Sequence, residues 1–203
     1  MRKTLVVLFA LLICGALPLF AQEKEAAKEA MPSMMPPKPL TDHDFFAWMT
    51  GEWEGWSTSP MGKSQDWQKL ELALDDQFVV WHYTAKTTEP NMEAMKAMNM
   101  SKEDMDKMLS TPYKGMGIMT INPANDELAA YWFDNYRGTY KGTGKREGMK
   151  IVTTWESPMG SETRVIEKVS DDKMVMTFKG KDPTGKEIEG RTELTRTKMA
   201  GKS

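Results

Sequence analysis

Hydrophobic and polar residues alternate along most of the chain after residue 41, in short runs separated by turn-forming residues. Leu70 and Leu72 alternate with Lys69 and Glu71, which is typical of a strand with one buried face. The pattern predicts strands at 52–59, 65–74, 77–87, 114–121, 127–134, 138–145, 148–156, 161–169, 173–180 and 186–197. About ten strands without alternating helices favour an all-β fold, an antiparallel up-and-down β-barrel.

The same alternation predicts which side chains face the barrel interior. They are Leu70, Leu72, Leu74, Val79, Trp81, Tyr83, Met174, Met176, Phe178, Ile188, Thr192 and Leu194. For the strand at 77–87 the prediction assumes a two-residue turn at Asp75-Asp76, because a three-residue loop would reverse inside and outside. His82 then faces outward.

Two segments have helical rather than strand character. A short helix is expected over 42–49, capped by Thr41 or Asp42 and ended by Gly51. The methionine-rich segment 90–112 predicts two short helices, the first capped by Asn91 and the second beginning at Ser101. We expect this insertion to form a lid over one barrel end. The side chains expected to face the barrel are Met95, Met98, Met105 and Leu109.

The N-terminus is typical of a secretory signal peptide over residues 1–21, with Arg2 and Lys3 before a short apolar run. Cleavage after Ala21 would leave a proline-rich linker over 22–40 and a barrel domain over 41–198. The run is short for a membrane anchor. Lipidation of Cys14 is an alternative, although Ile13 is larger than the residue that usually precedes a lipidated cysteine. We expect an exported protein, periplasmic or secreted, without a stable membrane anchor.

Composition excludes several classes of function. The net charge of -2 does not favour a nucleic-acid partner, and the only cysteine lies in the signal segment. The sequence has no Gly-x-Ser-x-Gly, His-Glu-x-x-His or phosphate-binding glycine motif. His43 and His82 lie in different elements, which does not favour haem. We therefore expect a non-catalytic protein without a cofactor, and the oligomeric state is left open.

Three segments stand out in order along the chain: Trp48 to Gly55 with its Gly-x-Trp, Gly117 to Pro123 followed by Tyr131 to Asn135, and Glu193 to Arg196. Together they resemble a bacterial family catalogued as domain of unknown function 1579, and the resemblance covers about residues 44–197. The chain departs from the family at Ile121, where a tyrosine is usual. The resemblance implies a lipocalin-like (calycin) barrel with an internal cavity and no established activity. It also implies that Arg196 lies across the ring of Trp53 at the closed end.

Aromatic residues provide the candidate ligand site. The residues that could line a pocket for a small apolar or amphipathic ligand are Trp53, Trp81, Tyr83, Trp132, Phe133 and Trp155. Asp134 and Arg164 are the polar candidates within it. The alternative is a structural or protein-interaction barrel whose core is filled by these same side chains.

Methionine is unusually frequent, with 19 residues. Met92, Met95 and Met98 share one side of a predicted helix, and thioether sulfur is a ligand suited to Cu(I) or Ag(I). Soft-metal binding is therefore an alternative function. Methionine is also a flexible packing residue, so a methionine-rich lid explains the same pattern.

Overall fold

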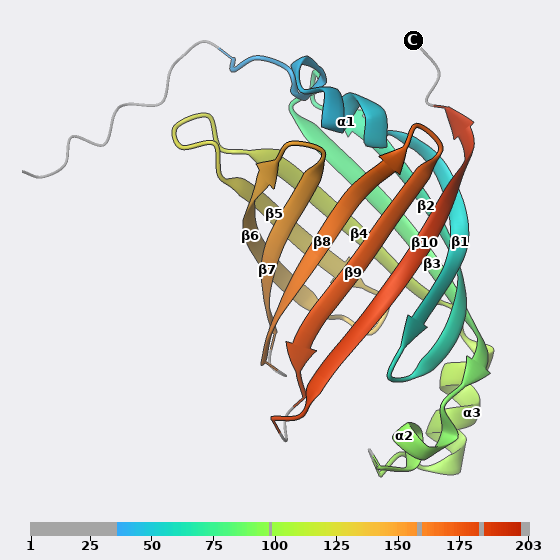
Figure 1. Cartoon of the computed structure of the whole chain (residues 1–203). Coiled ribbons are helices and arrows are strands. Elements are labelled where there is room, and N and C mark those ends of the chain that lie inside the picture. The colour runs from blue at the N-terminus through green and yellow to red at the C-terminus, as the bar shows by residue number, and fades with distance from the viewer. Residues whose placement is uncertain (1–35, 98, 158–159, 183–184, 200–203) are drawn as a thin grey trace, which may run out of the picture. The chain divides into compact units, whose positions relative to one another are not determined.

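The computed structural model describes residues 36–97, 99–157, 160–182 and 185–199. Within them, ten antiparallel strands form a closed barrel in which each strand pairs with the next along the chain (Figure 1). The strands are β1 (Gly51–Ser59), β2 (Gly62–Ala73), β3 (Phe78–Pro90), β4 (Tyr113–Ile121), β5 (Leu128–Asp134), β6 (Thr139–Glu147), β7 (Lys150–Ser157), β8 (Gly160–Ser170), β9 (Lys173–Lys181) and β10 (Glu187–Met199). Pairing of β1 with β10 closes the ring and leaves no open sheet edge. The predicted fold class is confirmed.

The turn between β2 and β3 differs from the predicted two-residue turn. Ala73 pairs with Phe78, so the turn spans the four residues 74–77. Its residues with positive φ are Leu74, Asp75 and Asp76. Leu74 is 73% exposed, and its predicted inward position is wrong because it belongs to the turn and not to the pleated strand. Pairing 73 with 78 keeps the same parity as pairing 74 with 77, so Trp81 still faces inward.

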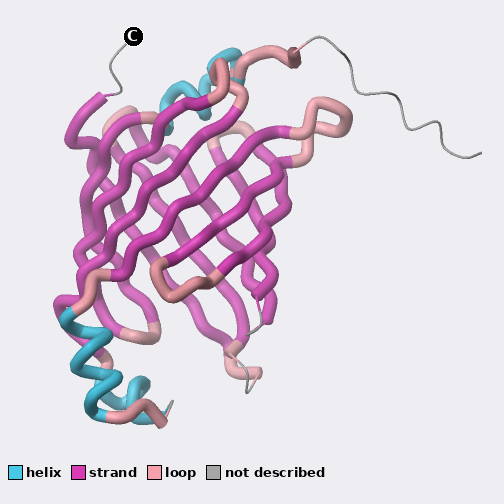
Figure 2. Tube along the Cα trace, turned by 180° about the vertical axis from the view of Figure 1, so that it is seen from behind, coloured by secondary structure: helices cyan, strands magenta, loops and turns pink. Residues whose placement is uncertain are grey.

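One end of the barrel is covered by η1 (Leu40–Asp42) and α1 (Asp44–Met49), as both views show (Figures 1 and 2). α1 begins two residues later than the predicted helix because Leu40–Asp42 forms a separate 3-10 turn, and no side chain caps its start. Leu40 is buried, and its amide donates to the Asp76 carbonyl at 2.8 Å. Assigning Leu40 to the linker was therefore wrong. The signal peptide and the rest of the linker up to residue 35 lie outside the described residues.

The methionine-rich insertion contains α2 (Met92–Ala97) and α3 (Lys102–Ser110), as predicted. The Ala94 amide donates to Asn91 Oδ1 at 3.2 Å, and the Asp104 amide donates to Ser101 Oγ at 3.0 Å. The two helices project from the barrel end opposite α1, beside the end of β3 (Figures 1 and 2). Of the side chains expected to face the barrel, Met95 and Met105 are buried and Leu109 is half-buried, while Met98 lies outside the described residues.

The hydrophobic core is concentrated next to α1. Phe45, Phe46 and Met49 of this helix are fully buried, and they belong to the same core as Trp53 and Leu194 of the barrel. Over the described part of the chain, no helix has the length and apolar character needed to cross a membrane. The other half of the barrel, towards the turn at 60–61, contains the cavity described next.

Candidate ligand-binding cavity

A cavity of about 570 Å³ lies inside the barrel, with a lining drawn from β1 to β5 and β7 to β10. A second, outer cavity of about 430 Å³ adjoins it. Tyr113, Trp132, Trp155 and Arg164 line both. No described residue of α2 or α3 lines either one, so the role of these helices as a lid stays a prediction.

The six residues predicted to bind ligand surround these two connected spaces. Five of them line the inner cavity: Trp81, Tyr83, Trp132, Trp155 and Arg164. Asp134 lines only the outer cavity. Trp53 lines neither cavity, so its predicted place in the pocket is wrong. The same prediction is wrong for Phe133, which is 41% exposed on the outer face of β5. Successive residues of a strand face opposite sides of the sheet, and Trp132 already occupies the inner position.

Glycines on neighbouring strands make room for the two largest rings of the cavity wall. A Cβ at Gly115 would lie 2.1 Å from Trp132 Cζ2, and a Cβ at Gly142 would lie 2.8 Å from Trp155 Cδ2. Each indole therefore lies against the backbone of the adjacent strand, where any larger residue would overlap with it. Because the rings lie against the wall, they do not fill the centre of the barrel. These glycines were not predicted as site residues, although they alternate with outward residues in β4 and β6.

Ring contacts and hydrogen bonds fix the aromatic wall. Trp81 packs edge-to-face against Trp132, with 5.4 Å between ring centroids. Trp132 Nε1 donates to the Tyr113 hydroxyl at 2.8 Å, and Trp155 Nε1 donates to Thr153 Oγ1 at 2.9 Å. Burial raises the pKa of Tyr113 to about 12, so its hydroxyl stays neutral and keeps a donor hydrogen. Tyr113 was not among the predicted site residues.

The outer cavity is more polar. Arg164 Nε lies 2.5 Å from Glu162 Oε1, and the guanidinium carbon is 5.7 Å from the centre of the Trp155 ring. Asp134 Oδ1 accepts hydrogen bonds from the amides of Tyr136 and Gly138, at 2.9 and 2.8 Å. Both predicted polar residues thus already have partners within the protein.

A buried carboxylate lies behind one wall of the inner cavity. Asp66 on β2 has no exposed surface, and it accepts hydrogen bonds from Ser57, from Ser64 at 2.7 Å and from Tyr83 at 2.7 Å. Thr192 Oγ1 lies 2.7 Å from Ser57 Oγ. Ser57, Ser64, Asp66, Tyr83 and Thr192 are called the Asp66 cluster below. All its members except Asp66 line the cavity.

Burial shifts the ionisation of two members of this cluster. It raises the pKa of Asp66, although the hydrogen bonds from Ser57, Tyr83 and Ser64 act in the opposite direction. The pKa of Tyr83 is raised as well, first by burial and then by the neighbouring Asp66 carboxylate. Asp66 was not among the predicted site residues, but the alternation that places Leu70 and Leu72 inward also places residue 66 inward.

Two buried polar atoms have no hydrogen-bond partner among the described residues. They are Trp81 Nε1 and Gln68 Oε1. Trp81 lines the cavity, whereas Gln68 neighbours Tyr83 in the sheet. An unpaired buried polar group costs about 1–3 kcal/mol, so both atoms would gain from a polar partner.

The structure describes two of the three proposed soft-metal ligands, Met92 and Met95. Met92 is 41% exposed, whereas Met95 is fully buried, so their sulfur atoms lie in different environments. Met98 lies outside the described residues, and metal binding by this triplet stays a prediction. Among the described residues, no group of three or more His, Cys, Asp or Glu side chains is arranged to hold a metal ion.

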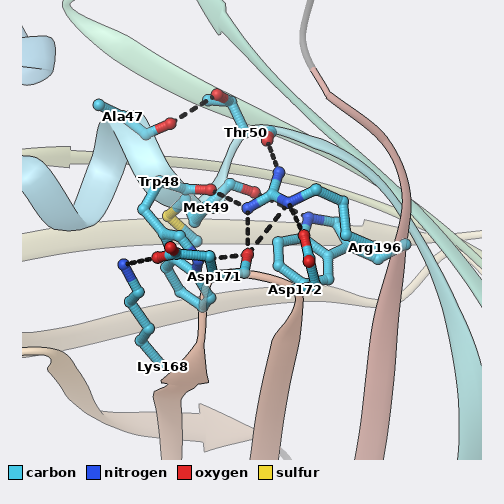
Figure 3. Close-up of polar contacts among 9 residues, drawn as sticks. Ala47, Trp48, Met49, Thr50, Lys168, Asp171, Asp172 and Arg196 are labelled. Atoms are coloured by element: carbon cyan, nitrogen blue, oxygen red, sulfur yellow. Dashed lines mark hydrogen bonds and ion pairs between the residues drawn. The ribbon is translucent and has the colours of Figure 1, made fainter.

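At the closed end, the structure places Arg196 against Trp53, with 4.0 Å between the guanidinium carbon and the ring centre. Figure 3 shows Arg196 between the end of α1 and the turn at 171–172; it donates to the carbonyls of Trp48 and Thr50 at 2.5 Å and of Asp171 at 3.2 Å. Burial lowers the pKa of Arg196, and nearby Asp172 and Asp171 oppose that shift. An arginine titrates so high that it stays charged at neutral pH.

No protein-family model matches the chain, and no curated protein matches it. Among solved structures it is similar to an S-type phycobiliprotein lyase from Guillardia theta, with 10% identity and a TM-score of 0.46, covering 79% of this chain and 92% of that one. It is also similar to a protein of unknown function from the DUF3598 family of Nostoc punctiforme, with 10% identity and a TM-score of 0.26, covering 75% and 98%. Membership of the domain of unknown function 1579 family stays a prediction.

Proposed function

We propose that the protein binds a small, flat, apolar or amphipathic molecule inside the barrel without catalysing a reaction. The observation that carries the proposal is the inner cavity of about 570 Å³, lined by indole and phenol rings. Sites for small molecules have volumes of roughly 300–1,000 Å³ and mostly apolar walls with a few polar groups. A barrel whose own side chains filled its interior would lack such a space.

The placement of the rings supports a flat ligand. Trp132 and Trp155 lie over glycines of the neighbouring strands, so a planar molecule can stack on a ring face or pack on its edge. The carboxylates at the outer cavity support binding over catalysis. Glu162 pairs with Arg164, and Asp134 is used to hold the turn between β5 and β6.

The test is binding of the fluorescent, uncharged probe N-phenyl-1-naphthylamine to the full chain, followed by its displacement with an extract of the native host. Ala130→Phe should block the cavity, because Ala130 is buried and lines it. Ala129→Phe is the matched control, because Ala129 directly precedes Ala130 on β5 and its side chain faces the outside of the barrel. Equal binding by both variants, or no binding by the unchanged protein, would contradict the proposal.

We also propose that the protein is exported, on the strength of the N-terminal segment alone. Mass spectrometry of the protein isolated from its host should give the mass of a chain beginning at Gln22. A mass that retains residues 1–21, or a lipid-modified chain beginning at Cys14, would contradict cleavage after Ala21.

A further inference from the structure

Asp66 is a buried carboxylate without a cationic partner in the described part of the chain. Its side chain has no exposed surface, and no Lys, Arg or His nitrogen among the described residues lies within ion-pair distance of it. Arg164, which also lines the cavity, is paired with Glu162. Burial of a charge is unfavourable unless the charge is paired and hydrogen-bonded. When ionised, Asp66 therefore places an unbalanced negative charge directly behind the wall of the inner cavity.

The hydrogens of the Asp66 cluster point towards this carboxylate. Ser57, Ser64 and Tyr83 each have one hydroxyl hydrogen, and each donates it to Asp66. Since the Ser57 hydrogen is already used, Thr192 must be the donor in the contact of 2.7 Å between Thr192 and Ser57. These four hydroxyls therefore have only oxygen lone pairs left to offer to the cavity. Such a surface accepts hydrogen bonds and repels a ligand carboxylate.

We propose that the Asp66 cluster is the subsite for a protonated amine, and that the cavity takes a flat apolar molecule with an ammonium head group. The inference rests on the proposed function. An ammonium group donates up to three hydrogen bonds and would compensate the charge of Asp66. The ring centroid of Tyr83 lies 5.8 Å from that of Tyr113 and 5.9 Å from that of Trp132, and these rings add attraction for a cation. The apolar part of the ligand would then extend along Trp132 and Trp155.

The experiment compares three probes that share one ring system but differ in the head group. They are 1-naphthylmethylammonium, 1-naphthalenemethanol and 1-naphthoate, titrated into the full chain by isothermal calorimetry at neutral pH. The ammonium probe should bind about tenfold more tightly than the alcohol, and the carboxylate should bind most weakly. Asp66→Asn should remove the preference for ammonium over alcohol. Glu54→Gln is the matched control and should retain it, because Glu54 is an exposed carboxylate on β1 that lines neither cavity.

Thr192→Val is a second variant that leaves Asp66 in place, in case Asp66→Asn does not fold. It should weaken binding of the ammonium probe more than binding of the alcohol. Equal affinity for all three probes would overturn the inference and leave the proposed function intact. If 1-naphthoate bound most tightly and this affinity were lost in Arg164→Gln, the head group would be assigned to Arg164. That outcome would overturn the inference. Binding of none of the probes would overturn the inference and count against the proposed function as well.

Discussion

At the end covered by α1, Arg196 donates hydrogen bonds to three backbone carbonyls and lies on the ring of Trp53. In the other half, three hydroxyls hold the carboxylate of the Asp66 cluster next to an open cavity, with no cationic partner among the described residues. Both sites contain a buried charge. At the closed end, the charged Arg196 completes the hydrogen bonding of the carbonyls at the end of α1. In the cavity half, the hydroxyls around Asp66 keep acceptor lone pairs that are not used. This difference is what separates a group that maintains the fold from one available to a ligand.

The largest effect is expected at the closed end. Trp53→Ala should lower the free energy of unfolding by about 3–5 kcal/mol, because it empties a fully buried site and removes the ring under Arg196. Urea unfolding followed by circular dichroism measures the change. Trp56→Ala is the matched control, because Trp56 on the same strand is 57% exposed and its loss should change stability by less than about 0.5 kcal/mol. Similar losses in the two variants would refute the assigned packing.

Arg196→Ala should lower the free energy of unfolding by about 2–4 kcal/mol, since the carbonyls of Trp48 and Thr50 lose their donor. The same unfolding assay applies. Arg191→Ala on the same strand serves as the control. Its side chain is half exposed and pairs with Glu193 at the surface, a contact worth at most about 1 kcal/mol. If the two arginine variants were equally stable, the closed-end contact would have no special importance.

A smaller effect is expected where a glycine of β6 lies against an indole of the cavity wall. Gly142→Ala would place a methyl group 2.8 Å from the Trp155 ring and should lower stability by about 1–3 kcal/mol. The ring must then move towards the cavity, so affinity for N-phenyl-1-naphthylamine should fall as well. Thr143→Ala, on the neighbouring outward position, should leave the affinity unchanged. Unchanged probe affinity in Gly142→Ala would show that this glycine does not keep the cavity open.

The smallest effect is a pH dependence at Asp66. Its pKa in the folded protein is raised above the unfolded value, mainly by burial, so the protonated form favours folding. The contribution to stability is complete below the unfolded pKa and is lost as pH rises through the folded pKa. As pH rises from 4 to 7, the free energy of unfolding of Asp66→Asn should therefore increase relative to that of the unchanged protein. A constant difference over this range would mean that burial does not perturb Asp66.

The strands, their order and the two insertion helices were predictable from the sequence, because alternation and turn residues act locally. The placement of Trp81, Tyr83, Trp132 and Trp155 inside the barrel follows from the same two-residue period. Leu74 shows the limit of this reasoning. The local pattern extended the strand by one residue, while the paired chain made a four-residue turn with the same register.

Only the tertiary structure decided whether the interior is filled or open. That outcome depends on Gly115 and Gly142, which face indoles of adjacent strands. The sequence of one strand cannot predict which ring of a neighbouring strand will pack against it. The Asp66 cluster is likewise assembled from β1, β2, β3 and β10, with Ser57 and Thr192 separated by 135 positions in the chain. A pattern along one strand can place a carboxylate inside a barrel. Its hydroxyl partners and the absence of a cation among the described residues depend on contacts between strands, which form only when the barrel closes.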